Sequence, residues 1–171
     1  MKSLIIFIVI SAVPSVLFGV IDFNGNGISE IWELQYKGAV TNDIDSDGDG
    51  ISNQAEGIAG TDPYDSMSLL ALENPVLDGV KVQFSWSAAA GKSYRLERWD
   101  SVVNNWSEAA LVLPLSAAAV QTVTLDRLDG GVFRLVVADI DLDGDGLSAW
   151  EEILLGTSDE SSAGLDGSGE G

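Results

Sequence analysis

The 171-residue sequence contains no cysteine and no histidine. The chain therefore has no disulfide, no thiolate or imidazole ligand for zinc, no thiol nucleophile and no histidine for acid–base catalysis. Basic residues are also scarce, since eight lysines and arginines stand against 27 acids and leave a formal net charge of −19. So acidic a chain is a poor partner for nucleic acid or an anionic membrane surface. If the protein is secreted, it lacks the disulfides that often stabilise such proteins, and bound Ca²⁺ could stabilise the fold instead.

The acids are concentrated toward the two ends of the chain. Residues 20–65 carry ten acids and one base, and residues 139–171 carry ten acids and no base. Residues 66–138 carry seven acids and six bases, so this middle part is almost neutral. The charge distribution therefore predicts a different role for the ends than for the middle.

Three twelve-residue loops place oxygen-bearing side chains at the same spacing. In residues 45–56, Asp occupies positions 1, 3 and 5, Gly50 occupies position 6 and Glu56 occupies position 12. Glycine takes the sharp left-handed turn at position 6 without strain, and Ca²⁺ prefers such an oxygen-only shell, completed by the backbone carbonyl at position 7. The predicted Ca²⁺ ligands are Asp22, Asn24, Asn26, Ile28 and Glu33; Asp45, Asp47, Asp49, Ile51 and Glu56; and Asp141, Asp143, Asp145, Leu147 and Glu152. The two asparagines remove charge, so the first loop is expected to bind most weakly; the alternative for all three is a solvated acidic turn without metal.

Residues 1–19 have the composition of a secretory signal peptide. Lys2 precedes an apolar run from Leu4 to Val13, which Pro14 and small residues follow. The alternative is an uncleaved anchor, because the apolar stretch is about long enough to span a bilayer. Both interpretations place the rest of the chain outside the cytoplasm, so we expect a secreted, periplasmic or cell-surface protein.

Apolar spacing separates helical segments from strands. It predicts short helices at residues 29–37, 52–59 and 147–155, each after one of the loops. In the middle segment Val80, Val82, Phe84 and Trp86 alternate with polar residues, as in a strand with one buried face. Strand-like runs lie at residues 69–73, 80–87, 93–97, 109–113, 119–125 and 131–138. The predicted fold class is mainly β with short helices: a small antiparallel β-sandwich flanked by calcium loops that each precede a helix.

These patterns divide the chain into five parts. The predicted parts are a signal peptide (1–19), two calcium-loop repeats (20–66), a β-sandwich (67–138), a third calcium-loop repeat (139–157) and a disordered acidic tail (158–171).

The loops resemble bacterial thrombospondin type 3 repeats, which read Asp-x-Asp-x-Asp-Gly, an aliphatic residue, Ser or Thr, a following Glu, and Gly-Thr-Asp-Pro. Residues 45–63 match almost throughout, residues 141–157 match as far as the Gly-Thr, and residues 22–33 match in the loop alone. The middle segment resembles a divergent fibronectin type III sandwich at residues 82–86, 93–97 and 133–138, without a seventh strand. The resemblance implies a calcium-binding structural or adhesion-type protein that meets a surface protein or a polysaccharide.

Two other functions stay open at this point. The 23-residue offset between the first two loops resembles a dockerin-like module for assembling extracellular enzymes, although Gly60 and Pro63 break the segment where such modules have a long helix. A carbohydrate-binding accessory module is the other, because Trp99 and Trp106 could form a stacking face, whereas Trp86 is expected in the core. No acid outside the loops lies in a recognisable catalytic context, so we expect no enzymatic activity.

Overall fold

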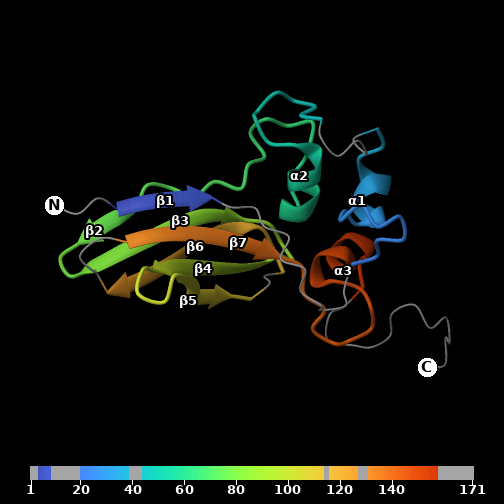
Figure 1. The fold of residues 1–171 in the computed structure, drawn as a ribbon. Coiled ribbons are helices and arrows are strands. Elements are labelled where there is room, and N and C mark those ends of the chain that lie inside the picture. The colour runs from blue at the N-terminus through green and yellow to red at the C-terminus, as the bar shows by residue number, and fades with distance from the viewer. Residues whose placement is uncertain (1–3, 9–19, 39–43, 114–115, 127–130, 158–171) are drawn as a thin grey trace.

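The computed structural model describes residues 4–8, 20–38, 44–113, 116–126 and 131–157 (Figure 1). The strands among these residues are β1 (Leu4–Ile8), β2 (Val76–Asp78), β3 (Lys81–Ala88), β4 (Ser93–Asp100), β5 (Asn105–Val112), β6 (Ala119–Asp126) and β7 (Gly131–Ala138). The helices are α1 (Glu30–Gln35), α2 (Asn53–Ala59) and α3 (Ala149–Leu155). Figure 1 shows the strands forming one body and the three helices grouped at one end of it.

The strands form two sheets that pack against each other. One sheet has the order β1-β7-β4-β5, and the other has the order β2-β3-β6. β1 runs parallel to β7, whereas the other pairings among the described strands are antiparallel. The predicted mainly β fold with a small antiparallel sandwich and short helices is thus confirmed, and a parallel strand is added at one edge.

The core between the sheets is built from alternate residues of β3, β4 and β7. Side chains that meet there are Val82, Phe84, Trp86, Ala88, Tyr94, Leu96, Phe133, Leu135 and Val137. Trp86 is fully buried, as its register predicts. Val80, by contrast, is 75% exposed, because the strand begins only at Lys81, after the turn that contains Gly79.

Two strand predictions need correction. Residues 69–73 do not form a strand: Leu72 makes a single bridge to Trp86, and β2 begins only at Val76. Pro75 lies between them and has no N–H to donate to a ladder, so continuous pairing is interrupted there. β5 begins at Asn105, before the predicted run of 109–113, because an edge strand can carry polar, exposed residues that show no apolar pattern.

The N-terminal segment contains an element that the sequence does not predict. Residues 4–8, inside the predicted signal peptide, form β1. The remainder of that segment and the predicted acidic tail lie outside the described residues. The signal peptide and the tail therefore stay predictions.

The serine at position 8 of each loop caps the start of the helix that follows. Ser29, Ser52 and Ser148 are the N-caps of the three helices, and each side chain accepts a backbone N–H from the first turn. α2 and α3 end at Gly60 and Gly156, both at φ 74, where glycine avoids the strain of a side chain. The three predicted helices are present, and each is slightly shorter than the predicted range. None of these described helices has the length and apolar character needed to cross a membrane.

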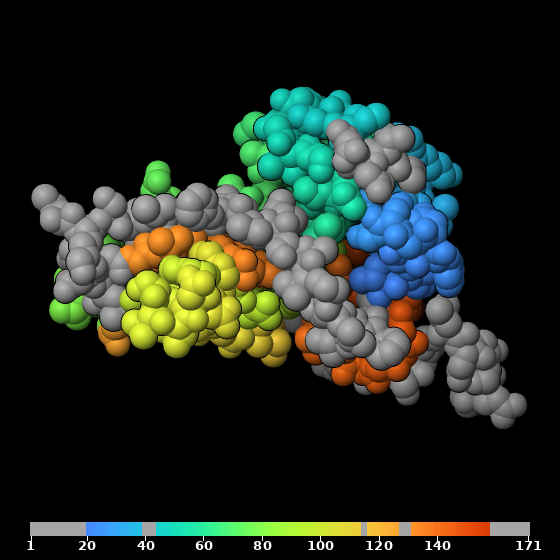
Figure 2. All heavy atoms as spheres, in the orientation of Figure 1, coloured from blue at the N-terminus to red at the C-terminus, as the bar shows by residue number. Residues whose placement is uncertain are grey.

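The turn between β3 and β4 fixes the third repeat to the end of the sandwich. A Cβ added at Gly91 would lie 2.3 Å from Trp150 Cα, so the two backbones are in direct contact. Lys92 Nζ lies 2.8 Å from Asp139 Oδ1 and 4.5 Å from the centroid of the Trp150 ring. The Lys92 side chain is 1% exposed, and a buried ammonium group requires a partner of this kind. These contacts hold the third repeat against the sandwich, and Figure 2 shows the blue, teal and red-orange repeats gathered at that end of the molecule.

Replacing Gly91 by alanine is expected to lower the free energy of unfolding by about 3 kcal/mol, because the new Cβ overlaps backbone atoms that cannot rotate away. Urea denaturation in the presence of calcium measures the change. Gly79→Ala is the matched control: Gly79 also has positive φ (55), but a Cβ there meets nothing within 4 Å. The control should lose only the backbone strain, about 1 kcal/mol, and equal losses at both positions would contradict the close contact at Gly91.

Candidate metal centres

All three loops share one backbone frame. The Asp at position 1 accepts N–H bonds of 2.6–3.0 Å from the glycines at positions 4 and 6. Both glycines have positive φ in every loop; position 6 is predicted from the sequence, and position 4 is not. The N–H at position 9 also donates to the carbonyl of the residue before the loop, over 2.7–2.9 Å. That residue is isoleucine each time (Ile21, Ile44 and Ile140), a repeat signal that the sequence reading missed.

The second loop gathers three carboxylates. One oxygen each from Asp45, Asp47 and Asp49 lies within 4.8 Å of the other two. Asp47 and Asp49 use Oδ1 to accept the N–H of Asp49 and Ile51, at 3.1 and 2.6 Å. Within the described residues, Oδ2 of both aspartates and Oε2 of Glu56 are buried and accept no hydrogen bond. Buried carboxylate oxygens without partners are unfavourable, so this arrangement fits a cation that would satisfy them.

The third loop repeats this arrangement. Asp141, Asp143 and Asp145 again bring one oxygen each within 4.8 Å of one another. In the part of the chain that the structure describes, the Oδ2 atoms of Asp143 and Asp145 are buried and accept no hydrogen bond. Glu152 is 1% exposed, and its N–H donates to the Ser148 carbonyl at 2.9 Å, as the N–H of Glu56 donates to Ser52 in the second loop. Position 12 therefore has the same backbone placement in both loops.

The donors of these two loops are the kind that Ca²⁺ prefers. They are oxygens only, three aspartate carboxylates gather at each site, and the two loops contain no histidine or cysteine that could offer a nitrogen or sulfur ligand. The acids that would hold an ion are Asp45, Asp47, Asp49 and Glu56 in one loop and Asp141, Asp143, Asp145 and Glu152 in the other. The carbonyl ligands predicted at Ile51 and Leu147 stay predictions.

The clustering of charge shifts the ionisation of the second loop. Burial and the negative charges of Asp47 and Asp49 raise the pKa of Glu56 to about 7. Conversely, the backbone N–H of Gly50 lowers the pKa of Asp45. Without a cation, Glu56 therefore binds a proton more tightly in the folded than in the unfolded chain, and the metal-free fold loses stability as pH rises toward 7.

Calcium affinity of the second loop should fall as the pH is lowered below 7, because Glu56 must release its proton before it can bind the ion. The apparent association constant is expected to fall by up to about tenfold per pH unit. Titrations at several pH values above 5 measure this slope. Glu56→Gln removes the titrating group, so this variant should bind more weakly with a flatter profile; an equally steep profile would assign the proton to another residue.

The first loop differs from the other two in its internal bonds. Asn24 Nδ2 lies 3.3 Å from both carboxylate oxygens of Glu33, and Asn26 Nδ2 lies 2.5 Å from Glu33 Oε1. The Oδ1 atoms of these asparagines accept backbone N–H groups, as Oδ1 of Asp47 and Asp49 does in the second loop. Amide N–H groups thus stand where the second loop presents oxygens. The predicted calcium site of Asp22, Asn24, Asn26, Ile28 and Glu33 stays a prediction, with a weaker donor set than its two counterparts.

Glu151 joins the first repeat to the third, and the sequence reading did not single it out. Its Oε1 accepts the backbone N–H of Ile21 at 3.0 Å and the hydroxyl of Ser29 at 2.6 Å. Its Oε2 accepts the N–H and the hydroxyl of Ser148, at 2.9 and 3.0 Å, which closes a capping box. The Ser-x-x-Glu spacing was a readable signal for the cap. No pattern in the sequence indicates the contact of Glu151 with Ile21, which lies 130 residues away.

The tryptophans of the outer sheet face do not form a flat surface. Trp99 and Trp106 are both half-buried, with ring centroids 5.3 Å apart and planes inclined by 65°. The Arg134 guanidinium lies 4.4 Å from the centroid of the Trp106 ring. Sugar stacking uses an open ring face, so carbohydrate binding through these two residues stays a prediction.

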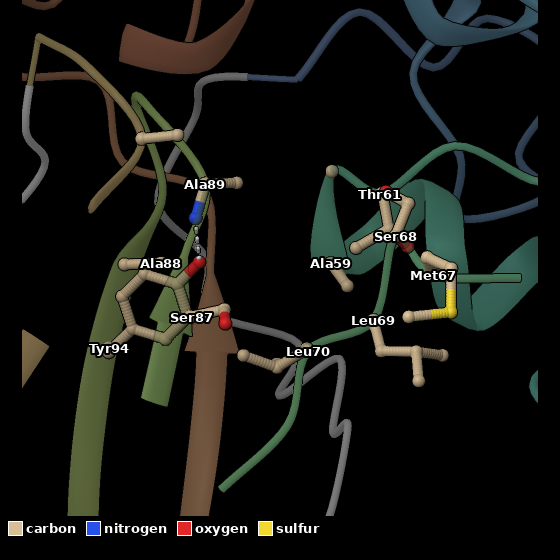
Figure 3. A pocket seen from close by; sticks show the side chains of 12 residues that line it. Ala59, Thr61, Met67, Ser68, Leu69, Leu70, Ser87, Ala88, Ala89 and Tyr94 are labelled. Carbon is tan, nitrogen blue, oxygen red and sulfur yellow. Dashed lines mark hydrogen bonds between the residues drawn. The ribbon is translucent and has the colours of Figure 1, made fainter. Parts of the chain in front are cut away.

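A cavity of about 250 Å³ lies between the end of α2 and the sandwich (Figure 3). Ala59, Leu70 and Ala88 are among the small or aliphatic side chains that line it, and no lining residue is charged. Tyr94 accepts the N–H of Ala89 at 2.7 Å, and burial raises the pKa of its hydroxyl to about 12. The cavity is therefore separate in character from the acidic loops and offers no charged acid or base.

Comparison with known proteins identifies one part of the chain. Residues 45–66 match the family described as the bacterial TSP3 repeat, a repeat of calcium-binding type. No curated protein and no solved structure matches the chain, so the fibronectin type III resemblance of the sandwich is not confirmed. The matched residues contain the second loop, α2 and the Gly-Thr-Asp-Pro that follows it. The chain therefore carries a bacterial TSP3 repeat at residues 45–66, as the sequence resemblance indicates.

Proposed function

We propose that the chain is an exported structural protein in which Ca²⁺, held by the second and third loops, rigidifies the repeats and their junction with the β-sandwich. The observation that carries this proposal is a set of buried carboxylate oxygens that accept no hydrogen bond within the described residues: Asp47 Oδ2, Asp49 Oδ2, Glu56 Oε2, Asp143 Oδ2 and Asp145 Oδ2. A hard divalent cation supplies the positive charge that such oxygens require. The match to a calcium-binding type of repeat supports the same assignment.

The position of the third loop explains how an ion would stiffen the junction. β7 ends at Ala138, the next residue Asp139 pairs with Lys92, and the loop begins two residues later at Asp141. An ion held by this loop ties the end of β7 to the start of α3. The bound ion would also offset the mutual repulsion of the four acids predicted to hold it, Asp141, Asp143, Asp145 and Glu152.

We assign the sandwich the role of a spacer or binding module that meets a surface protein or a polysaccharide, and we assign the chain no catalytic activity. Export is supported by the composition of residues 1–19. A structural role is favoured over a dockerin-like one because α2 has only seven residues and ends at Ala59, before the left-handed Gly60. A helix this short suits a compact connector rather than a long recognition surface.

Thermal unfolding in calcium and in chelator tests the proposal. One site filled at a hundred times its Kd adds about 2.7 kcal/mol, so two sites should raise the melting temperature by about 10 °C or more. Magnesium at the same concentration is the control, and its effect should be smaller, because Mg²⁺ needs a tighter octahedral shell and keeps its waters. Equal melting temperatures in calcium and in chelator would exclude the structural role of the metal.

A further inference from the structure

β7 has the residues of a central strand, although it lies next to the edge of its sheet. Its sequence is Gly-Val-Phe-Arg-Leu-Val-Val-Ala, in which Arg134 is the one charged residue, and with β1 in place the exposed fractions of Phe133, Leu135, Val136 and Val137 are 0–3%. Val136 is buried although its side chain lies opposite the core-facing row of Phe133, Leu135 and Val137. Strands of this composition are normally paired on both sides.

Two edge strands of the same sandwich, β5 and β6, carry polar residues on their exposed side, whereas β2 is an edge strand of only three residues that exposes Val76 and Leu77 beside Asp78. β5 exposes Asn105, Ser107 and Glu108, and β6 exposes Thr122 and Thr124 on its outer side. Polar and charged residues keep a free edge soluble and discourage pairing with other chains. Since β7 lacks this protection apart from Arg134, its sequence is suited to a neighbour on each side.

β4 pairs with one side of β7, and β1 supplies the neighbour on the other. β1 runs parallel to β7 over five residues, from Leu4 opposite Gly131 to Ile8 opposite Leu135. Its sequence, Leu-Ile-Ile-Phe-Ile, is uncharged and rich in β-branched residues. These residues belong to the apolar run that has the composition of a secretory leader.

We propose that removal of this leader opens the edge of β7, and that the exported protein then accepts an extended aliphatic strand from a partner protein, parallel to β7. This inference rests on the proposed export with cleavage. β1 shows the chemistry that the edge takes: an uncharged, β-branched segment whose backbone completes the ladder. Such strand addition gains affinity from main-chain hydrogen bonds and specificity from alternate side chains.

Residues 158–171 are poorly suited to replace β1 at this edge. Residues 158–171 contain four glycines, four serines and four acids, with a single leucine, so their composition disfavours a strand. A second processed copy would likewise have lost its leader and could reach this edge only with its own β7, in an antiparallel pairing about a two-fold axis, whereas β1 pairs with this edge in parallel. A partner with a free aliphatic segment therefore fits best.

The test compares two forms of the full chain. Export from a bacterial host yields the processed form, and production without export yields the form that keeps residues 1–19; intact mass identifies each. The probe is a synthetic peptide that carries residues 4–8 between solubilising lysines. The control peptide has Ile6→Pro, which removes one backbone N–H opposite Phe133. Fluorescence anisotropy in calcium measures binding of both peptides to both forms.

The processed form should bind the probe at least about tenfold more tightly than it binds the proline peptide, and at least about tenfold more tightly than the unprocessed form does. If the processed chain does not bind the probe, or binds both peptides equally, the proposal that the β7 edge is open is overturned. The calcium proposal is not affected by that result. An exported chain that retains residues 1–19 overturns both the cleavage and this inference. A processed chain that dimerises and thereby excludes the probe assigns the edge to a second copy and overturns the partner strand.

Discussion

Replacing Glu151 by alanine is expected to lower the free energy of unfolding by about 3–5 kcal/mol, because each buried donor left without an acceptor costs about 1–3 kcal/mol. The carboxylate is 0% exposed and accepts four hydrogen bonds, from the N–H of Ile21, the hydroxyl of Ser29, and the N–H and hydroxyl of Ser148. The substitution removes every acceptor at once and leaves a cavity between the first and third repeats. Chemical denaturation in saturating calcium measures the loss.

Two further variants serve as controls for the effect of Glu151→Ala. Glu151→Gln retains one carbonyl acceptor, so it should lose less than the alanine variant while remaining folded. Glu108→Ala removes an exposed glutamate of β5 and should change stability by less than about 0.5 kcal/mol. If Glu151→Ala were as mild as Glu108→Ala, the first and third repeats would not be held together by this side chain.

Removing one aspartate from either loop is expected to abolish calcium binding at that loop alone. Asp49→Ala and Asp145→Ala each delete one carboxylate from a group whose oxygens lie within 4.8 Å of one another. Because calcium affinity depends on the number of charged ligands, each change should weaken its site by about 100-fold or more. Calcium titration of each variant should show one ion fewer than the parent chain, and the double variant should show two fewer.

Asp78→Ala is the control for these variants, since Asp78 is an exposed acid of β2 outside the loops. It removes the same charge and should leave the number of bound ions unchanged. A loss of binding in Asp78→Ala, or an unchanged number of ions in the two loop variants, would mean that calcium follows net charge rather than the loop geometry.

The local features of this protein could be predicted from its sequence. The spacing of Asp, Gly and Glu gives the loop register, and the serine at position 8 and the glycine after α2 mark the helix ends. The alternation of Val82, Phe84 and Trp86 gives the buried face of β3. Each of these signals lies within a few residues, where backbone geometry and side-chain chemistry act directly on one another.

The long-range features could not be predicted in this way. Whether residues 69–73 or 76–78 pair with β3 depends on the partner strand and on Pro75, and composition favoured the wrong stretch. The pairing of β1 with β7 and the contact of Glu151 with Ile21 join residues more than 120 positions apart. Hydrophobic periodicity shows that a face is buried, but it does not show what covers that face.

Calorimetric titration of the chelator-treated protein with Ca²⁺ tests the central claim most directly. The carboxylate groups at Asp45, Asp47 and Asp49 and at Asp141, Asp143 and Asp145 predict at least two bound ions. A third, weaker ion would assign calcium to the first loop, where Asn24 and Asn26 now donate to Glu33. Absence of any binding heat, with a melting temperature that chelator does not change, would contradict a calcium-stabilised structure and reduce the acidic loops to solvated turns.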